Sequence, residues 1–178
     1  WQWRIPLQNR VGNGLVLCDQ YCSTATAEQE LIATISGALI TAPRLIRFAT
    51  GKRRAMWAGN CVAIGLSAGF LEPLESTGLY LIMRAILNFA KLLPRRTPCP
   101  YTRTEFNRLM NAEYEHIRDF IIMHYCTSQR DDSPFWRDWQ EREIPDSLKT
   151  KLGMYKSQGR LLINSHDLFA EDSWHAVL

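Results

Sequence analysis

Two acidic side chains, Glu72 and Glu75, stand in an otherwise apolar stretch over residues 69–78. Burial disfavours the charged form of a carboxyl group unless a partner compensates, and carboxyl groups in such surroundings are concentrated at active sites. The alternative is a pair of acids at a helix terminus, with Glu72 as a cap near the positive end of the helix dipole. The spacing alone favours this alternative.

The end of the same stretch has the features of an anion site. Ser76, Thr77 and Gly78 come directly before an apolar helix that is predicted over residues 79–93 and is ended by Pro94. Backbone amides at a helix N-terminus bind anions, and glycine allows an ion or a ring to approach the backbone closely. The helix is apolar on nearly all sides, which is typical of a buried helix. An anion or cofactor site at the start of this helix is therefore physically reasonable.

Two tryptophans at a spacing of two residues are a further candidate. Trp1, Trp3 and Ile5 share one face of a half-buried strand that is predicted over residues 1–7. The two indole rings either build a rigid wall beside a ligand or pack in an ordinary core. Composition alone favours core packing.

A second aromatic group is predicted around a helix end. Tyr125 closes one predicted helix and Phe135 and Trp136 open the next, with Asp131 between them. These rings either form a pocket whose acid holds an amine, or they pack in the core beside a well-capped helix. The spacing alone again favours core packing.

The elements that must position these residues begin with strands. Asn-Gly at residues 13–14 is typical of a hairpin turn, so a returning strand is predicted over residues 14–18. Alternating apolar residues predict further strands over residues 44–48 and 55–64, with a turn at 51–54 between them.

Helices follow the strands. Capping boxes are predicted at Thr26 and Thr102, and Ser-Pro at residues 133–134 is typical of a cap with proline in the first turn. Gly159 is expected to end a short helix, and Phe169 begins the last one. Strands first and helices afterwards predict the α+β class.

Composition and charge exclude several classes of function. The chain has 178 residues, of which 46% are hydrophobic, and this is enough for one core. Its net charge of +3 is too small for the dense basic stripe of a nucleic-acid-binding domain. The longest apolar run is interrupted by Arg84 and Lys91, so no membrane span is predicted.

The cysteines and histidines argue against a metal site. Five scattered cysteines are typical of reduced thiols in a cytoplasmic protein rather than of a disulfide framework. Cys18 and Cys22 lack the second pair of ligands that a zinc site needs. No metal is therefore expected.

Taken in order, these signals resemble one family, the flavin-dependent tryptophan halogenases. The resemblance covers the whole chain and rests most on Trp-x-Trp-x-Ile-Pro at residues 1–6 and Glu-Pro-Leu-Glu-Ser-Thr at residues 72–77. Supporting matches lie at residues 10–14, 59–65, 68–78, 130–136 and 169–174. The resemblance implies the C-terminal part of a flavin-monooxygenase-like, FAD/NAD(P)-binding fold, with a mixed sheet segment followed by a mainly helical lobe.

The resemblance also implies how the chain is organised. Residues 1–93 would form the sheet segment and the helix on the flavin and halide side, and residues 94–178 a helical lobe on the substrate side. The family's Gly-x-Gly-x-x-Gly phosphate loop and its catalytic lysine would lie upstream of Trp1, and the last helix is unfinished. We therefore expect a fragment that by itself neither binds FAD tightly nor halogenates.

The family's reaction implies the cofactor and the partners. A separate flavin reductase supplies reduced FAD, and oxygen and chloride or bromide then yield hypohalous acid. This acid reaches an electron-rich aromatic substrate, usually an indole, and halogenates it by electrophilic substitution. Whether the protein is a homodimer is left open.

Residue roles carry over where the motifs match. Glu75 resembles the catalytic glutamate, which polarises the hypohalous acid or takes the ring proton. Thr77 and Gly78 resemble the contacts to the halide. Positions that match the region beside the flavin ring are Gly59, Asn60, Leu66 and Leu79. The motif thought to keep substrate away from the flavin comprises Trp1, Trp3, Ile5 and Pro6.

The substrate end departs from the enzymes that act on free tryptophan. Those enzymes have a Tyr-Tyr pair, a Glu, a Phe-Trp pair and an Asn. The corresponding positions here are His124, Tyr125, Asp131, Phe135, Trp136 and Gln140. The aromatic wall is kept, but the groups that hold the amine and carboxylate of the amino acid are altered. The sequence therefore predicts a plain indole, another aromatic molecule or something larger as the substrate.

Two other functions remain open. One is a flavin-dependent aromatic monooxygenase that hydroxylates, which the tryptophan motif disfavours and which halide-dependent product formation would distinguish. The other is a non-catalytic interaction domain that uses the helical half. It would gain support if the full-length protein lacked the phosphate loop and the lysine.

Overall fold

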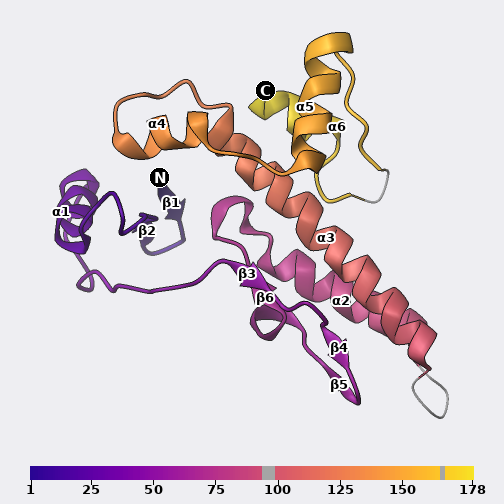
Figure 1. The fold of residues 1–178 in the computed structure, drawn as a ribbon. Coiled ribbons are helices and arrows are strands. Elements are labelled where there is room, and N and C mark those ends of the chain that lie inside the picture. Colours follow the sequence, from indigo (N-terminus) through magenta and orange to yellow (C-terminus); the bar gives the residue numbers. More distant parts are fainter. Residues whose placement is uncertain (94–98, 165–166) are drawn as a thin grey trace. The chain divides into compact units, whose positions relative to one another are not determined.

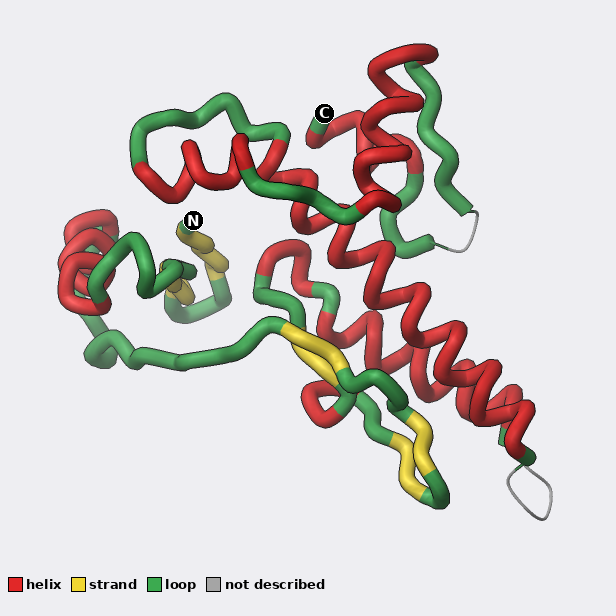
Figure 2. The backbone as a smooth tube through the Cα atoms, viewed as in Figure 1, coloured by secondary structure: helices red, strands yellow, loops and turns green. Residues whose placement is uncertain are grey.

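The computed structural model describes residues 1–93, 99–164 and 167–178 (Figures 1 and 2). The chain divides into two compact units, Trp1–Phe48 and Ala49–Leu178. This boundary is not the one expected near residue 93. The expected boundary divides the chain by function, into a flavin side and a substrate side. A division by compactness does not test it, so it remains a prediction.

The first unit begins with a hairpin. Strands β1 (Gln2–Pro6) and β2 (Val11–Leu15) pair in antiparallel fashion. The chain reverses between them, where the Leu7 amide donates to the Arg10 carbonyl at 2.8 Å. The turn predicted at residues 13–14 is therefore wrong, because both residues lie inside β2.

The Trp3 ring explains why an Asn-Gly pair lies within a strand. Trp3 is opposite Gly14 in the hairpin, and Ile5 is opposite Gly12. A Cβ atom on Gly14 would lie 2.3 Å from the Trp3 indole, and one on Gly12 would lie 3.3 Å from it. The glycines thus make room for the ring. Ile5 remains 51% exposed, so the predicted half-buried face extends only over the tryptophans.

Helix α1 (Thr24–Thr34) completes the regular structure of the first unit. Its cap is Ser23, whose hydroxyl accepts from the Thr26 amide at 3.1 Å. The capping box predicted at Thr26 is therefore wrong by one turn. The strand predicted over residues 44–48 does not form, and this segment has no regular structure.

The second unit contains two short strand pairs. Strand β3 (Gly51–Lys52) pairs with β6 (Gly69–Phe70), and β4 (Trp57–Ala58) pairs with β5 (Cys61–Val62), all antiparallel. The predicted turn at 51–54 is thus partly a strand, and the predicted strand over 55–64 is a tight hairpin. Together with the predominance of helices, these pairs confirm the α+β class.

Side-chain hydrogen bonds hold the β4–β5 hairpin against a helix. The Asn107 side-chain oxygen accepts from the backbone amides of Met56 and Trp57, both at 2.8 Å. The Asn107 amide group donates to the Trp57 carbonyl at 2.9 Å. Because these bonds join residues about fifty positions apart, no local pattern in the sequence predicts them.

Helices α2 (Gly78–Leu92) and α3 (Pro100–Cys126) pack along one another (Figure 1). Helix α2 is buried on one face only, since Leu81 is 4% exposed whereas Leu79 is 75% exposed. The prediction of a helix buried on all sides is therefore wrong. Pro94, the predicted stop, lies outside the described residues.

Helix α3 begins two residues before the predicted capping box. Its cap is Cys99, and the Thr102 hydroxyl donates to the Cys99 carbonyl at 2.8 Å instead of accepting from a backbone amide. The predicted apolar face is confirmed. Its buried residues include Phe106, Met110, Ile117, Phe120 and Ile121.

Three shorter helices follow and pack around the end of α3. Helix α4 (Pro134–Glu141) has Ser133 as its cap and proline in its first turn, as predicted. Helix α5 (Asp146–Gln158) ends at Gly159 with φ 64°, as predicted, and α6 (Glu171–Val177) is the last helix. The core between α3, α5 and α6 consists of Phe120, Met123, Leu148, Leu161 and Trp174. Among the described helices, none is both long and apolar enough to cross a membrane.

Candidate active site

The acid block, residues 69–78, has an unusual backbone. A short 3₁₀ turn, η2 (Leu74–Ser76), contains Glu75 with φ 65° and Ser76 with φ 54°. Side chains rarely adopt this left-handed region, and each such residue costs about 1–3 kcal/mol. Strain of this kind persists only where surrounding contacts hold the backbone, and it is concentrated at functional sites.

The last turn of α3 supplies two of those contacts. The Tyr125 hydroxyl donates to Glu72 Oε1 at 2.7 Å, and His124 Nε2 lies 3.1 Å from Glu75 Oε1. Two adjacent residues of one helix thus each hold one acid. The Glu75 side chain is 37% exposed and Glu72 is half-buried, so the burial expected for both acids is wrong for Glu75.

The start of α2 has the predicted features of an anion site. Thr77 is the cap residue and is only 3% exposed, and its carbonyl accepts from the Leu81 amide at 3.0 Å. No side chain caps the helix, and the first amides of a helix have no partner within it. The alternative in which Glu72 caps this helix is wrong, because α2 begins at Gly78.

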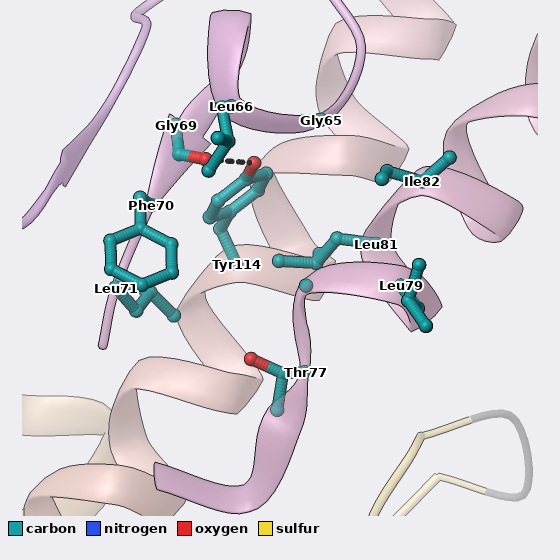
Figure 3. Close-up of a pocket in the computed structure, with 11 residues that line it drawn as sticks. Gly65, Leu66, Gly69, Phe70, Leu71, Thr77, Leu79, Leu81, Ile82 and Tyr114 are labelled. Atoms are coloured by element: carbon teal, nitrogen blue, oxygen red, sulfur yellow. Dashed lines mark hydrogen bonds between the residues drawn. The ribbon is translucent and has the colours of Figure 1, made fainter. Parts of the chain in front are cut away.

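A cavity lies beside this helix start, between α2, α3 and β6 (Figure 3). Its volume is 240 Å³, and its wall is mostly apolar. The residues that line it include Leu66, Phe70, Thr77, Gly78, Leu79 and Tyr114. The Tyr114 hydroxyl donates to the Gly69 carbonyl at 3.2 Å (Figure 3). Burial raises the pKa of Tyr114, so this phenol remains a donor at neutral pH.

The predicted flavin and halide contacts separate into two places. Leu66, Thr77, Gly78 and Leu79 line this one cavity. Gly59 and Asn60, in contrast, form the turn between β4 and β5 and are not part of its lining. The flavin and halide roles of all six residues remain predictions.

The lining of the cavity includes two exposed leucines and an open glycine. Leu66, which lies in the short 3₁₀ turn η1 (Gly65–Ser67), is 80% exposed, and Leu79 is 75% exposed. A Cβ atom on Gly78 would meet nothing within 4 Å. Two exposed leucines beside an open glycine backbone are suited to an isoalloxazine ring and to an anion near the α2 amides.

An aromatic layer lies next to the acid block. It is formed by Tyr125, Phe135, Trp136 and Trp139. Tyr125 stacks on Trp139 with centroids 5.0 Å apart and on Trp136 at 5.9 Å, and Phe135 meets Tyr125 edge-on at 5.8 Å. Tyr125 is only 6% exposed, so it supports the layer while its hydroxyl holds Glu72. The sequence did not single out Trp139, although its position three residues after Trp136 places both on one helix face.

The loop before α4 is held by the residue that matches the family's asparagine. The Gln140 amide group donates to the carbonyls of Arg130 at 2.8 Å and Ser128 at 3.4 Å. Arg137 donates to the Asp131 carbonyl at 2.6 Å, and Asp131 itself is exposed. Gln140 therefore serves the loop, and Asp131 is not enclosed by the aromatic layer.

A polar cluster of Tyr80, Arg84 and Glu113 joins helices α2 and α3 by hydrogen bonds. The Tyr80 hydroxyl and the Arg84 guanidinium both donate to Glu113, at 2.9 Å and 2.7 Å. Glu113 is 8% exposed. Burial and the bond to Glu113 raise the pKa of Tyr80 well above its usual value. The sequence did not predict this cluster, because its members lie about thirty residues apart.

The cysteines and acids form no metal site in the part of the chain that the structure describes. All five cysteines are free thiols. Across residues 1–93, 99–164 and 167–178, no group of three or more His, Cys, Asp or Glu side chains is placed to hold a metal ion.

Comparison with known proteins identifies the family to which this α+β chain and its acid block belong. The family model for tryptophan halogenases matches residues 1–178. The chain therefore belongs to the tryptophan halogenase family.

Solved structures of halogenases resemble the chain along its whole length. Xcc4156, a flavin-dependent halogenase from Xanthomonas campestris, superposes with a TM-score of 0.95 at 44% identity, over 99% of this chain and 36% of that one. BrvH, from Brevundimonas sp. BAL3, gives the same TM-score at 43% identity and the same coverage. This chain thus spans about a third of each of these proteins.

A tryptophan halogenase matches over a smaller share of the chain. The tryptophan 7-halogenase RebH from Lentzea aerocolonigenes is 37% identical over 158 residues, which are 88% of this chain and 30% of that protein. The chain thus spans about a third of the length of this relative as well.

Proposed function

We propose that this chain forms the halide and substrate side of an FAD-dependent halogenase that acts on an electron-rich aromatic molecule. The single observation that carries the proposal is the acid block. Glu75 is held in a left-handed backbone conformation by a neighbouring helix, directly before an uncapped helix start and beside an apolar cavity. This is the place where an anion, a flat ring and a carboxyl group can meet.

Each group of the site then has one task. Leu66 and Leu79 would lie along the flavin ring, and the first amides of α2, from Gly78 onward, would hold chloride or bromide. When bound, reduced FAD with oxygen and halide supplies hypohalous acid. Glu75 polarises that acid or accepts the proton that the aromatic ring loses on substitution.

The substrate proposal is an indole or a related aromatic molecule without the amino-acid backbone. Two observations support it. The Gln140 side chain donates to loop carbonyls, and Asp131 is exposed. Neither residue is therefore placed to hold the amine or the carboxylate of an amino acid. The aromatic layer offers Phe135, Trp136 and Trp139 as half-buried rings.

The test uses the full-length protein that carries this chain, a flavin reductase as the supply of reduced FAD, and bromide or chloride. Indole and free tryptophan are offered separately, and products are identified by mass spectrometry. We expect halogenated indole, formed only with halide present. A strong preference for tryptophan would overturn the substrate proposal, and hydroxylated product without halide would favour the monooxygenase. Absence of both products would favour the interaction domain.

A further inference from the structure

We infer that His124 is a positioning residue for Glu75, and that the two side chains share one proton. The inference rests on the proposed function, because it assigns a partner to the glutamate that the halogenation step uses. It starts from a contact that no motif predicted, His124 Nε2 at 3.1 Å from Glu75 Oε1.

The other ring nitrogen fixes the proton count of this contact. His124 Nδ1 lies 2.9 Å from the Phe120 carbonyl oxygen one turn earlier in α3. A carbonyl oxygen only accepts, so Nδ1 must carry a proton and donate it. The contact to Glu75 then contains one proton, which lies either on Nε2 facing a carboxylate or on Glu75 facing a bare Nε2. Both arrangements bind the same carboxyl oxygen.

The imidazole is well placed to hold a carboxyl group still. The Phe120 ring meets it edge-on, with centroids 4.9 Å apart and planes at 81°. The His124 side chain is 21% exposed, so it stands between the packed core and the more exposed Glu75. The neighbouring residue Tyr125 holds Glu72, so each acid of the block has its own partner on α3, and His124 is the partner of Glu75.

The contact determines which oxygen of Glu75 meets the substrate. Oε1 is directed to His124, which leaves Oε2 for the reacting ring. In the substitution, the O–X bond of hypohalous acid breaks, a C–X bond forms and hydroxide remains. The C–H bond at the same carbon then breaks, its electron pair returns to the ring, and the proton moves to Oε2. Transfer of that proton to the hydroxide gives water and restores Glu75.

Two variants of the full-length protein test the inference with reduced FAD, halide and indole. His124→Phe removes both ring nitrogens, whereas His124→Gln keeps a group that can donate to or accept from Glu75. We expect His124→Phe to lower kcat by about 10- to 100-fold, because the carboxyl group is no longer held in place, with little change in KM for indole. His124→Gln should recover most of this loss.

A control lies on the same helix. His116 pairs with Asp167 at 2.8 Å and not with either acid of the block, so His116→Gln should leave kcat unchanged. The inference is overturned if His124→Phe keeps full kcat, if it changes KM alone, or if His124→Gln is as impaired as His124→Phe while both unfold at the wild-type temperature. If the wild-type protein makes no halogenated product, the proposed function fails instead, so the two failures are distinct.

Discussion

The acid block and the aromatic layer are held by the same end of α3 in different ways. In the acid block, single hydrogen bonds from His124 and Tyr125 direct individual carboxyl oxygens on a strained backbone. In the aromatic layer, broad ring contacts at centroid distances from 5.0 Å hold Trp136 and Trp139. A hydrogen bond fixes one atom, whereas ring packing fixes a surface and tolerates substitution of similar size. This difference suits the roles proposed for them, Glu75 as a reacting group and the aromatic layer as an adaptable wall.

The largest effect is expected where a single atom matters. Glu75→Gln keeps the shape of the side chain but removes the base, so halogenation by the full-length protein should fall by about 10²- to 10⁴-fold. Product is measured by mass spectrometry with reduced FAD and bromide. Glu72→Gln is the matched change, and it should retain much more activity because Glu72 is the acid held by Tyr125. Equal losses in both variants would contradict the separate roles of the two acids.

The polar cluster between α2 and α3 extends the comparison from activity to stability. Glu113→Ala leaves Arg84 and Tyr80 without their shared acceptor, which should lower the free energy of unfolding by about 1–3 kcal/mol. Urea unfolding of the full-length protein checks this. Glu105→Ala is the control, because its pair with Arg108 is exposed and screened by solvent, so its loss should lower the free energy of unfolding much less. Similar losses would show that burial of Glu113 has no special effect.

In the first unit, the Trp3 ring packs directly on the backbone of Gly12 and Gly14. Such packing tolerates a larger residue less well than contacts between side chains do. Gly14→Ala would place a Cβ atom 2.3 Å from the Trp3 ring, whereas Gly12→Ala would place one at 3.3 Å. Overpacking costs about 1–3 kcal/mol, so Gly14→Ala should loosen the hairpin more than Gly12→Ala. Hydrogen exchange of the β2 amides measures the difference. Faster exchange in the Gly12 variant would contradict this account of the Asn-Gly pair.

The smallest effect is expected where the two regions meet, at Tyr125. Tyr125→Phe keeps the ring in the aromatic layer but removes the bond to Glu72. The free energy of unfolding should fall by about 0.5–1.5 kcal/mol, while KM for indole should stay close to the wild-type value. Trp139→Ala, in contrast, should raise KM for indole, because it opens the aromatic layer. A Tyr125→Phe variant with a strongly raised KM would show that its hydroxyl acts in substrate binding.

Much of the helical part was predictable because its signals are local. The apolar face of α3, the Ser-Pro start of α4 and the glycine stop of α5 follow from spacing and from backbone preference. The early strands were less predictable. The Asn-Gly pair in β2 is typical of a turn until the Trp3 ring is placed over it, and that contact comes from the opposite strand.

The candidate site also contains some residues that the sequence identified and others that only the packing of distant segments reveals. Glu75, Thr77 and Gly78 were identified from residue type, motif and the helix that follows them. The structure adds Tyr114 and pairs His124 with Glu75, since the acid block packs against α3, which follows about fifty residues later. It also leaves Gly59 and Asn60 on a separate hairpin.

The sequence by itself determined the family, the α+β class and the position of the acid block, because each depends on residue types at short spacing. Only the tertiary structure decided which side chain holds which carboxyl group. The left-handed backbone at Glu75 and Ser76 costs energy that no local preference repays. It is maintained by contacts from α3, and such contacts between distant residues exist only once the two segments have packed together.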